Sequence, residues 1–291
     1  MKWNSVVIDV NSMDVEEAKA YIGSHPSDSF QLVDVRQPEE YSKRHLPGAT
    51  LLPLEDLVDG KGNLDKMKPV LLYSRSGGRS LVGAQWLTTQ GFSEIWNITG
   101  GIKAWQGEAA FGHYKLNLNL LDPEADFPDA ISMAYAMEEG LQLFYILLAR
   151  ETKEEMYKRL YRKLAAFEVD HKRDLSQMYS ITQGKELIQK EIEEHDGQIM
   201  EGGGYADITL IKTLANTESA YDVFSLAIAF EAQALDFYSR LSTQAVRPEV
   251  KKFFLEMADA EKKHLLFVSK EMDKYIEQEK RFSNNEIHDN K

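Results

Sequence analysis

The chain has 291 residues, a formal net charge of −13 and no cysteine. Its length suits two domains better than one ordinary hydrophobic core. The excess of 47 acidic over 34 basic residues argues against a nucleic acid or an anionic membrane as a partner. The lack of cysteine excludes disulfides, thiolate zinc sites and iron–sulfur or Cys₄ iron centres within the chain. Redox chemistry would therefore need an external electron donor, either a protein or a small molecule.

No run of apolar residues approaches the roughly 18 that a membrane-spanning helix needs. The N-terminal residues 1–14 hold a short apolar run that acidic residues soon follow, without the small-residue pattern of a signal-peptide cleavage site. We therefore expect a cytoplasmic protein without a membrane segment.

Residues 1–110 alternate short β-rich runs with helical stretches, which predicts an α/β domain with a parallel sheet and flanking helices. The expected strands are Val6–Val10, Gln31–Val35, Ala49–Leu52, Val70–Ser74 and Ile95–Ile98. The expected helices are Val15–Ile22, Glu39–Lys43, Ser80–Gln90 and Gly101–Trp105.

A glycine-rich turn follows the fourth expected strand and opens a helix. It consists of Ser74, Arg75, Ser76, Gly77, Gly78, Arg79 and Ser80. Consecutive backbone N–H groups at a helix N-terminus, between two arginines, form a cradle for an anion or an anionic nucleophile. The alternative for Arg75 and Arg79 is simple pairing with nearby acidic side chains.

Further motifs accompany this turn: Asp34-Val35-Arg36, Glu40-Tyr41, His45-Leu46-Pro47-Gly48-Ala49 and Gly100-Gly101-Ile102-Lys103-Ala104-Trp105. With them, residues 5–107 resemble a rhodanese domain. In that family the first residue of the loop is the catalytic cysteine, which carries sulfane sulfur as a persulfide. Here that position holds Ser74.

A serine cannot form a persulfide, and its alkoxide is inaccessible near neutral pH without a dedicated base. We therefore predict that sulfurtransferase activity is absent. The sequence leaves two origins open for Ser74: a naturally inactive module kept for binding or docking, or an engineered replacement of cysteine.

Residues 111–127 show neither a helical nor a strand period cleanly and contain a proline, so we predict a linker. From residue 128 to 281 the pattern is helical, and residues 282–291 form a polar tail that we expect to fray.

Local signals place the helix ends within this second domain. Pro128 and Pro248 suit first helical turns, and Thr152 with Glu155 suggests a capping box. Two short-looped helix pairs are joined by a long crossover, in which we expect a short helix at Lys185–Glu194. This connectivity matches an all-α ferritin-like four-helix bundle.

The two helix pairs repeat one pattern of acidic and histidine residues. In each pair a glutamate stands 30 residues before a Glu-x-x-His motif, and the two copies are offset by 93 residues. The six residues are Glu138, Glu168, His171, Glu231, Glu261 and His264. Positions i and i+3 share a helix face, and apolar neighbours predict that these faces point inward.

Four carboxylates on apolar faces need compensation, because an uncompensated buried carboxylate costs at least several kcal/mol. Two divalent cations would balance them, and the mixed oxygen and nitrogen ligand set suits iron or manganese. One glutamate from each of two helices and a Glu-x-x-His from each of the others is the ligand set of di-iron carboxylate bundles. One Glu-x-x-His alone would be an ordinary solvated face; the duplication favours a metal site.

Residues 128–280 resemble the rubrerythrin and ferritin-like di-iron family. The resemblance implies that the six residues bind two iron ions, with manganese or zinc as substitutes, and that Glu168 and Glu261 bridge them. It implies that Tyr145 and Tyr238 donate hydrogen bonds to ligand carboxylates, where the alternative is ordinary core aromatics. The family has a further glutamate at Ala234, and its absence puts the family's redox-linked ligand shift in question. A homo-oligomer is also implied.

The leading hypothesis is a non-haem di-iron oxidoreductase that reacts with a small-molecule oxidant, hydrogen peroxide or dioxygen, and takes electrons from an external donor protein. One alternative is an iron-handling or sensing protein whose first domain docks a partner. The other is a thiosulfate-type sulfurtransferase inactivated by a cysteine-to-serine substitution at Ser74.

Overall fold

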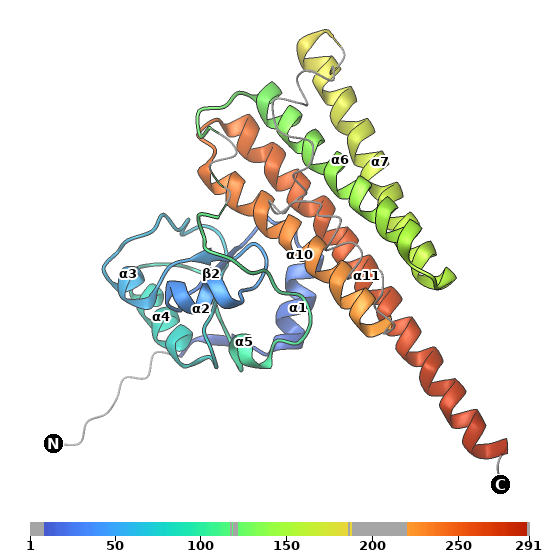
Figure 1. The fold of residues 1–291 in the computed structure, drawn as a ribbon. Coiled ribbons are helices and arrows are strands. Elements are labelled where there is room, and N and C mark those ends of the chain that lie inside the picture. Colours follow the sequence, from blue (N-terminus) through green and yellow to red (C-terminus); the bar gives the residue numbers. More distant parts are fainter. Residues whose placement is uncertain (1–8, 117, 119–121, 186, 188–219, 290–291) are drawn as a thin grey trace. The chain divides into compact units, whose positions relative to one another are not determined.

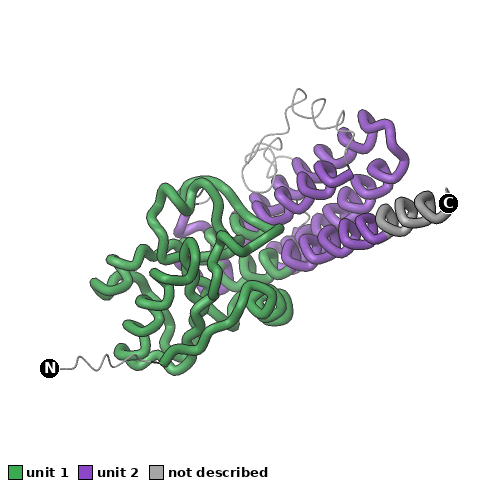
Figure 2. The backbone as a smooth tube through the Cα atoms, turned by 90° about the horizontal axis from the view of Figure 1, so that it is seen from below, with its two compact units in different colours: residues 1–119, 235–244, 251–259 green, residues 120–234, 245–250, 260–291 purple. Residues whose placement is uncertain are grey.

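The computed structural model describes residues 9–116, 118, 122–185, 187 and 220–289, with side chains up to Glu277. The chain forms two compact units (Figure 2). The first unit comprises residues 1–119, 235–244 and 251–259, and the second comprises residues 120–234, 245–250 and 260–291. The last two long helices therefore contribute residues to both units.

The first unit is built on a five-stranded parallel sheet in the order β1-β5-β4-β2-β3. The strands are β1 (Asn11–Met13), β2 (Gln31–Asp34), β3 (Thr50–Leu51), β4 (Val70–Tyr73) and β5 (Ile95–Ile98). The intervening helices are α1 (Val15–Ser24), α2 (Pro38–Lys43), α3 (Leu54–Val58), α4 (Gly78–Thr89) and α5 (Gly101–Ala104). The predicted α/β architecture is confirmed.

Strand β4 lies at the centre of the sheet, and all four of its residues are buried. Its alternate side chains supply two different cores, because successive residues of a strand point to opposite faces. Leu71 and Tyr73 pack in the core that contains residues of α1, α2 and α5, whereas Val70 and Leu72 pack in the core that contains residues of α3 and α4. Burial on both faces explains why β4 is uniformly hydrophobic.

Two expectations for this unit need correction. The first strand was expected at Val6–Val10; most of that range lies outside the described residues, and the strand that joins the sheet is Asn11–Met13. Helix α3 was not predicted. It is only five residues long, and its N-cap, Pro53, makes no side-chain capping bond, so neither a helical period nor a capping signal marks it in the sequence.

Asp236, in the part of helix α10 (Ala220–Gln244) that belongs to the first unit, is fully buried. It accepts a hydrogen bond from the Gly48 backbone N–H at 3.1 Å and from Arg240 Nε at 2.7 Å. Its Oδ2 also lies 3.3 Å from Nε2 of His45. Burial raises the pKa of Asp236, but His45 and Arg240 outweigh that effect and lower it, so the carboxylate stays charged.

The four long helices are α6 (Phe127–Glu151), α7 (Glu155–Gln183), α10 (Ala220–Gln244) and α11 (Pro248–Asp289). Helices α6 and α7 lie side by side (Figure 1). Asp126 caps the first turn of α6, because its side chain accepts a hydrogen bond from the N–H of Asp129 at 3.0 Å. Gly184, with φ of 66°, ends α7 in the left-handed conformation that glycine adopts without strain.

The predicted helical second domain is confirmed, with two corrections at helix ends. The capping box of Thr152 and Glu155 is wrong: Thr152 is the C-cap of α6, its N–H bonded to Leu148 O, and the N-cap of α7 is Glu154. Helix α11 continues to Asp289, so most of the tail predicted from residue 282 is helical. The short helix expected at Lys185–Glu194 lies almost wholly outside the described residues.

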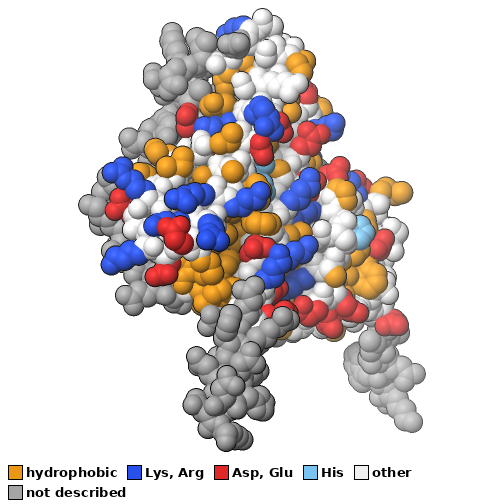
Figure 3. Space-filling model, turned by 90° about the vertical axis from the view of Figure 1, so that its right-hand side faces the viewer, with side chains coloured by type: hydrophobic (Ala, Val, Ile, Leu, Met, Phe, Trp, Pro, Cys, Tyr) orange, Lys and Arg blue, Asp and Glu red, His pale blue; other side chains and the backbone are white. Residues whose placement is uncertain are grey.

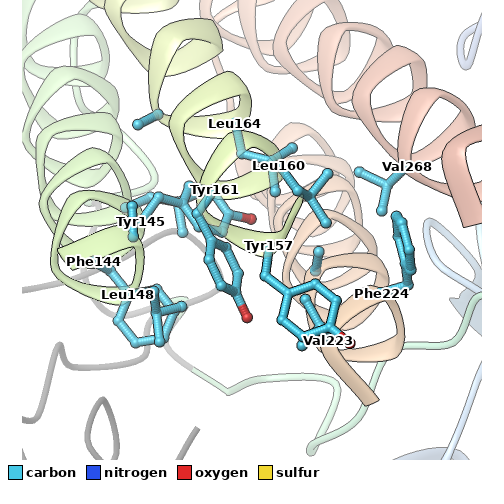
Figure 4. Close-up of a cluster of buried hydrophobic side chains, with 14 of the residues drawn as sticks. Phe144, Tyr145, Leu148, Tyr157, Leu160, Tyr161, Leu164, Val223, Phe224 and Val268 are labelled. Atoms are coloured by element: carbon cyan, nitrogen blue, oxygen red, sulfur yellow. The ribbon is translucent and has the colours of Figure 1, made fainter. Parts of the chain in front are cut away.

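An aromatic-rich hydrophobic cluster fills part of the second unit (Figure 4). Its largest fully buried members are Phe144 and Tyr145 of α6 and Tyr161 of α7. Within the described part of the chain, no helix is both long and apolar enough to cross a lipid bilayer.

Candidate functional site

The second unit gathers six acidic and histidine side chains from four helices. Glu138 comes from α6, Glu168 and His171 from α7, Glu231 from α10, and Glu261 and His264 from α11. All four glutamates are fully buried, while the side chains of His171 and His264 keep 14% and 11% exposure. The helical spacing predicted this convergence, and the structure brings all six residues into one cluster.

Three overlapping triads in this cluster can each offer three ligand atoms within 4.8 Å of one another. They are Glu168 with His171 and His264, Glu138 with His171 and Glu261, and Glu231 with Glu261 and His264. Each triad shares a member with each of the others, so the cluster is continuous. Its size and ligand types fit two neighbouring divalent ions.

Glu261 lies between the two histidines. Its Oε1 is 3.4 Å from Nδ1 of His171, and its Oε2 is 3.4 Å from Nδ1 of His264. Two ions bound beside the two histidines could share such a carboxylate. Glu168 shares a triad with both histidines as well, with its Oε2 3.6 Å from Nδ1 of His171.

The polar atoms at the centre of the cluster lack ordinary partners among the described residues. Both carboxylate oxygens of Glu168 and of Glu261, and Nδ1 of His171 and of His264, make no hydrogen bond although they are buried. Buried polar atoms are otherwise almost always satisfied. Bound cations would compensate this group of converging buried polar atoms, so these residues fit a metal centre.

Without cations, the cluster must retain protons. Burial raises the pKa of Glu168 well above its usual value, and the Glu138 carboxylate raises it further. Burial also raises the pKa of Glu261, to about 7, against the opposing effect of His264. Burial lowers the pKa of His171 and of His264, but the surrounding carboxylates outweigh it and raise them to about 12 and about 9. Metal binding would therefore displace protons.

Tyr145 supports one of the carboxylates. Its hydroxyl donates a hydrogen bond of 2.6 Å to Oε1 of Glu231, and both groups are fully buried. Tyr238 is also fully buried, and its ring stacks on that of Phe254 at 6.2 Å. The hydrogen bond expected from Tyr238 to a ligand carboxylate stays a prediction.

Aromatic stacking around the histidines was not predicted. The rings of His171 and His264 stack at 4.6 Å, and the ring of Phe167 stacks on that of His264 at 4.5 Å. Phe167 directly precedes the ligand motif of α7, but an aromatic residue at a helical position is so common in cores that its sequence position carries no specific signal.

The glycine-rich turn from Ser74 to Ser80 follows β4 and opens α4, as its sequence predicts. Gly77 adopts φ of 96°, and its N–H donates to Oγ of Ser74 at 3.2 Å. Oγ of Ser74 lies 3.2 Å from Oγ of Ser80, which donates to Oδ1 of Asn97 at 2.7 Å. These partners are hydroxyl, amide and backbone groups, none of which is a general base for Ser74.

The two arginines of the turn differ. Arg79 donates two hydrogen bonds to the carboxylate of Glu40, at 2.6 and 2.7 Å. This is the pairing with a nearby acidic side chain that the sequence left open as the alternative to anion binding. Arg75 and Ser76 are exposed, as is Gly78. Gly101 packs against the start of the turn so closely that a side-chain carbon there would lie 2.2 Å from the Ser74 carbonyl oxygen, which requires glycine.

Two family models match different parts of the chain. The family model of the rhodanese-like domain matches residues 14–108, and the rubrerythrin model matches residues 222–289. The uncharacterized protein YqhL of Bacillus subtilis is 42% identical over 78 residues, which are 27% of this chain and 62% of that protein. A sulfurtransferase of Allochromatium vinosum is 32% identical over 96 residues, which are 33% of this chain and 88% of that protein.

Among solved structures, a rhodanese-like domain protein from Staphylococcus aureus matches with 27% identity and a TM-score of 0.31, over 33% of this chain and 92% of that one. These relatives each cover about a third of the chain or less, and the rubrerythrin model matches the last two long helices of the helical part. The chain belongs to the rhodanese family through its N-terminal domain and joins that domain to a rubrerythrin domain.

Proposed function

We propose that the chain is a di-iron oxidoreductase of the rubrerythrin type that consumes hydrogen peroxide or dioxygen. The proposal rests on the position of Glu261, whose two buried carboxylate oxygens each lie close to one of two stacked histidines. Glu261 is one of four fully buried glutamates in the cluster. Such a cluster is costly to fold without cations, so a purely structural role does not account for it.

The six residues of the three triads would together hold two ions, and Glu261 and Glu168 are placed so that both ions could share them. When bound, two iron ions supply reversible two-electron redox chemistry to a small oxidant. The protein holds the carboxylates in place through buried helices, and Tyr145 fixes the orientation of Glu231 through its hydrogen bond. The near-complete burial of the cluster excludes bulk water and limits access to small molecules.

The burial of the site suits peroxide-sized substrates. The glutamates are inaccessible, and only the two histidines keep some exposure, so a larger organic substrate has no path to the carboxylates among the described residues.

The rhodanese-like domain keeps its loop but carries Ser74 in place of a thiol, so it would not transfer sulfur.

The test loads the metal-free protein anaerobically with ferrous iron and follows its oxidation by hydrogen peroxide in a stopped-flow spectrometer. The proposal expects uptake of two irons per chain and oxidation of both by one peroxide, faster than free ferrous iron reacts. The control is the Glu261→Ala variant, which lacks the shared carboxylate. Oxidation no faster than that of free iron would remove the proposal, and continued iron uptake beyond two per chain would favour iron storage.

A further inference from the structure

A row of basic residues lies on the outer face of α7. From Met156 to Phe167 this helix carries Lys158, Arg159, Arg162 and Lys163 and no acidic residue, in a chain of net charge −13. Arg159, Arg162 and Lys163 are exposed, and none of them forms an ion pair with another described residue. Positions three and four apart share a helix face, so their charges add. Figure 3 shows many lysine and arginine side chains, with acidic side chains among them, on the face of the molecule that it presents.

The same face continues into a small apolar area. Ala166 follows Arg162 by one turn, and Val169, 47% exposed, follows it by two. A charged rim beside an exposed apolar centre is the usual anatomy of a protein–protein interface. We define the α7 face as Arg159, Arg162, Lys163, Ala166 and Val169.

This face is connected to the metal cluster by stacked rings. Nζ of Lys163 lies 4.8 Å from the ring centre of Phe167, and the Phe167 ring stacks on His264 at 4.5 Å with an interplanar angle of 11°. His264 in turn stacks on His171. The histidines are the exposed members of the cluster, whereas its glutamates are fully buried. The α7 face is therefore linked to the cluster through Lys163, Phe167 and His264.

We propose that the α7 face docks a small acidic electron-carrier protein, which reduces the metal centre along the path through Phe167 and His264. This inference rests on the proposed function. Reduction of one hydrogen peroxide to two waters takes two electrons and two protons, and the chain has no cysteine-ligated centre to supply those electrons. Two reduced one-electron carriers would each give one electron and leave oxidised, with the protons taken from solvent.

Charge complementarity selects an acidic carrier over other occupants. A protein of net charge −13 repels an acidic partner over most of its surface, so an isolated basic row directs such a partner to one place. The area is small, which suits the weak and short-lived encounters of electron-transfer proteins. Such encounters weaken strongly as salt rises.

The experiment measures the rate at which reduced flavodoxin, an acidic carrier, reduces the iron-loaded, oxidised protein. Ionic strength is varied from about 0.01 M to about 1 M, over which the screening length falls from about 30 Å to about 3 Å. The test variant is Arg159→Glu/Arg162→Glu/Lys163→Glu. The matched control, Lys43→Glu/Lys103→Glu/Lys115→Glu, makes the same change in net charge at exposed lysines of the first unit.

We expect the wild-type rate to fall at least about tenfold from low to high salt, and the α7 variant to be at least about tenfold slower than the control at low salt. Reduction by dithionite should be equal in all three proteins, which shows that the centre is intact. For a neutral variant, Arg159→Gln/Arg162→Gln/Lys163→Gln, the rate of reduction should lie between those of the α7 variant and the control. This neutral variant replaces the test variant if charge reversal impairs folding.

The docking proposal is overturned when the α7 variant is no slower than the control, or when salt leaves the rate unchanged. Failure of the proposed function is seen separately, as absent iron uptake or absent reaction with peroxide. In that event, titration of flavodoxin into the metal-free protein, followed by NMR, still decides the question: shifts confined to the α7 face support docking, and their absence contradicts it. Salt-sensitive self-association that the α7 variant abolishes would assign the face to a second copy instead.

Discussion

At the scale of single residues, the buried carboxylates decide both the stability of the metal-free protein and its affinity for metal. Glu168 has no hydrogen-bond partner among the described residues and lies in one cluster with three other glutamates. We predict that Glu168→Gln stabilises the metal-free protein by about 1–3 kcal/mol at neutral pH, because burial raises the pKa of Glu168 so that it must take up a proton to fold, whereas glutamine does not. The same variant should bind iron more weakly. Urea unfolding and iron titration would check the two effects, and a loss of stability in the metal-free protein would contradict the account.

A matched pair of tyrosines tests the support of Glu231. Tyr145 donates a 2.6 Å hydrogen bond to that carboxylate, whereas the hydroxyl of Tyr161, on the neighbouring helix, has no partner among the described residues. Loss of a hydrogen bond to a charged group costs about 1.5–3 kcal/mol. Tyr145→Phe should therefore lower the free energy of unfolding by about that amount, and Tyr161→Phe should leave it nearly unchanged. Equal effects of the two variants would argue against the assigned role.

The loop serine gives a gain-of-function test. The cradle around Ser74 has its glycine turn and its backbone N–H in place, so the missing component is the thiol. We predict that Ser74→Cys produces thiosulfate-to-cyanide sulfur transfer, because a thiolate in such a cradle can carry a persulfide. Ser74→Ala is the control without activity. An inactive Ser74→Cys protein with a normal fold would mean that other parts of the loop have lost the chemistry as well.

At the scale of elements, a partly buried ion pair joins α2 to α4. The hydrogen bonds from Arg79 hold the pKa of Glu40 at about 2, below its usual 4.5. Because the folded pKa is the lower one, the pair stabilises the fold above about pH 4.5, and this contribution is lost as pH falls towards 2. Both side chains are about one-third exposed, so the contribution is at most about 1 kcal/mol.

The comparison of wild type with Glu40→Gln in urea unfolding measures this contribution. The variant should be less stable at neutral pH, and the difference should vanish as the pH approaches 2. A difference that does not depend on pH would show that Glu40 acts through packing and not through its charge.

The elements also show what the amino-acid sequence could and could not predict. The parallel sheet and the four long helices follow from strong periodic patterns, and the repeated Glu-x-x-His spacing is by itself enough to predict one cluster of six side chains. Weak local signals did not predict the structure. Helix α3 was missed because no side chain caps its N-terminus, and the capping box predicted at Thr152 is wrong because that residue is the C-cap of α6. The stacking of Phe167 on His264 depends on the packing of α7 against α11, which no local pattern encodes.

At the scale of the whole molecule, each unit has its own chemistry. The first keeps the rhodanese loop without its thiol, and the second gathers the carboxylate and histidine cluster. The α7 face is the proposed docking site of an external electron donor, because the chain has no cysteine that could ligate a redox centre of its own. A chain of this kind would couple an external reductant to a small oxidant at a buried centre.

The most direct test of the account is a metal titration of the full chain followed by thermal unfolding. Ferrous iron, manganese or zinc is added to the metal-free protein under anaerobic conditions, and both binding and the unfolding midpoint are recorded. Because ions that bind only the folded state stabilise it, we predict that the midpoint rises and that the effect saturates at two ions per chain. A protein that stays equally stable and binds none of these metals would contradict the central claim.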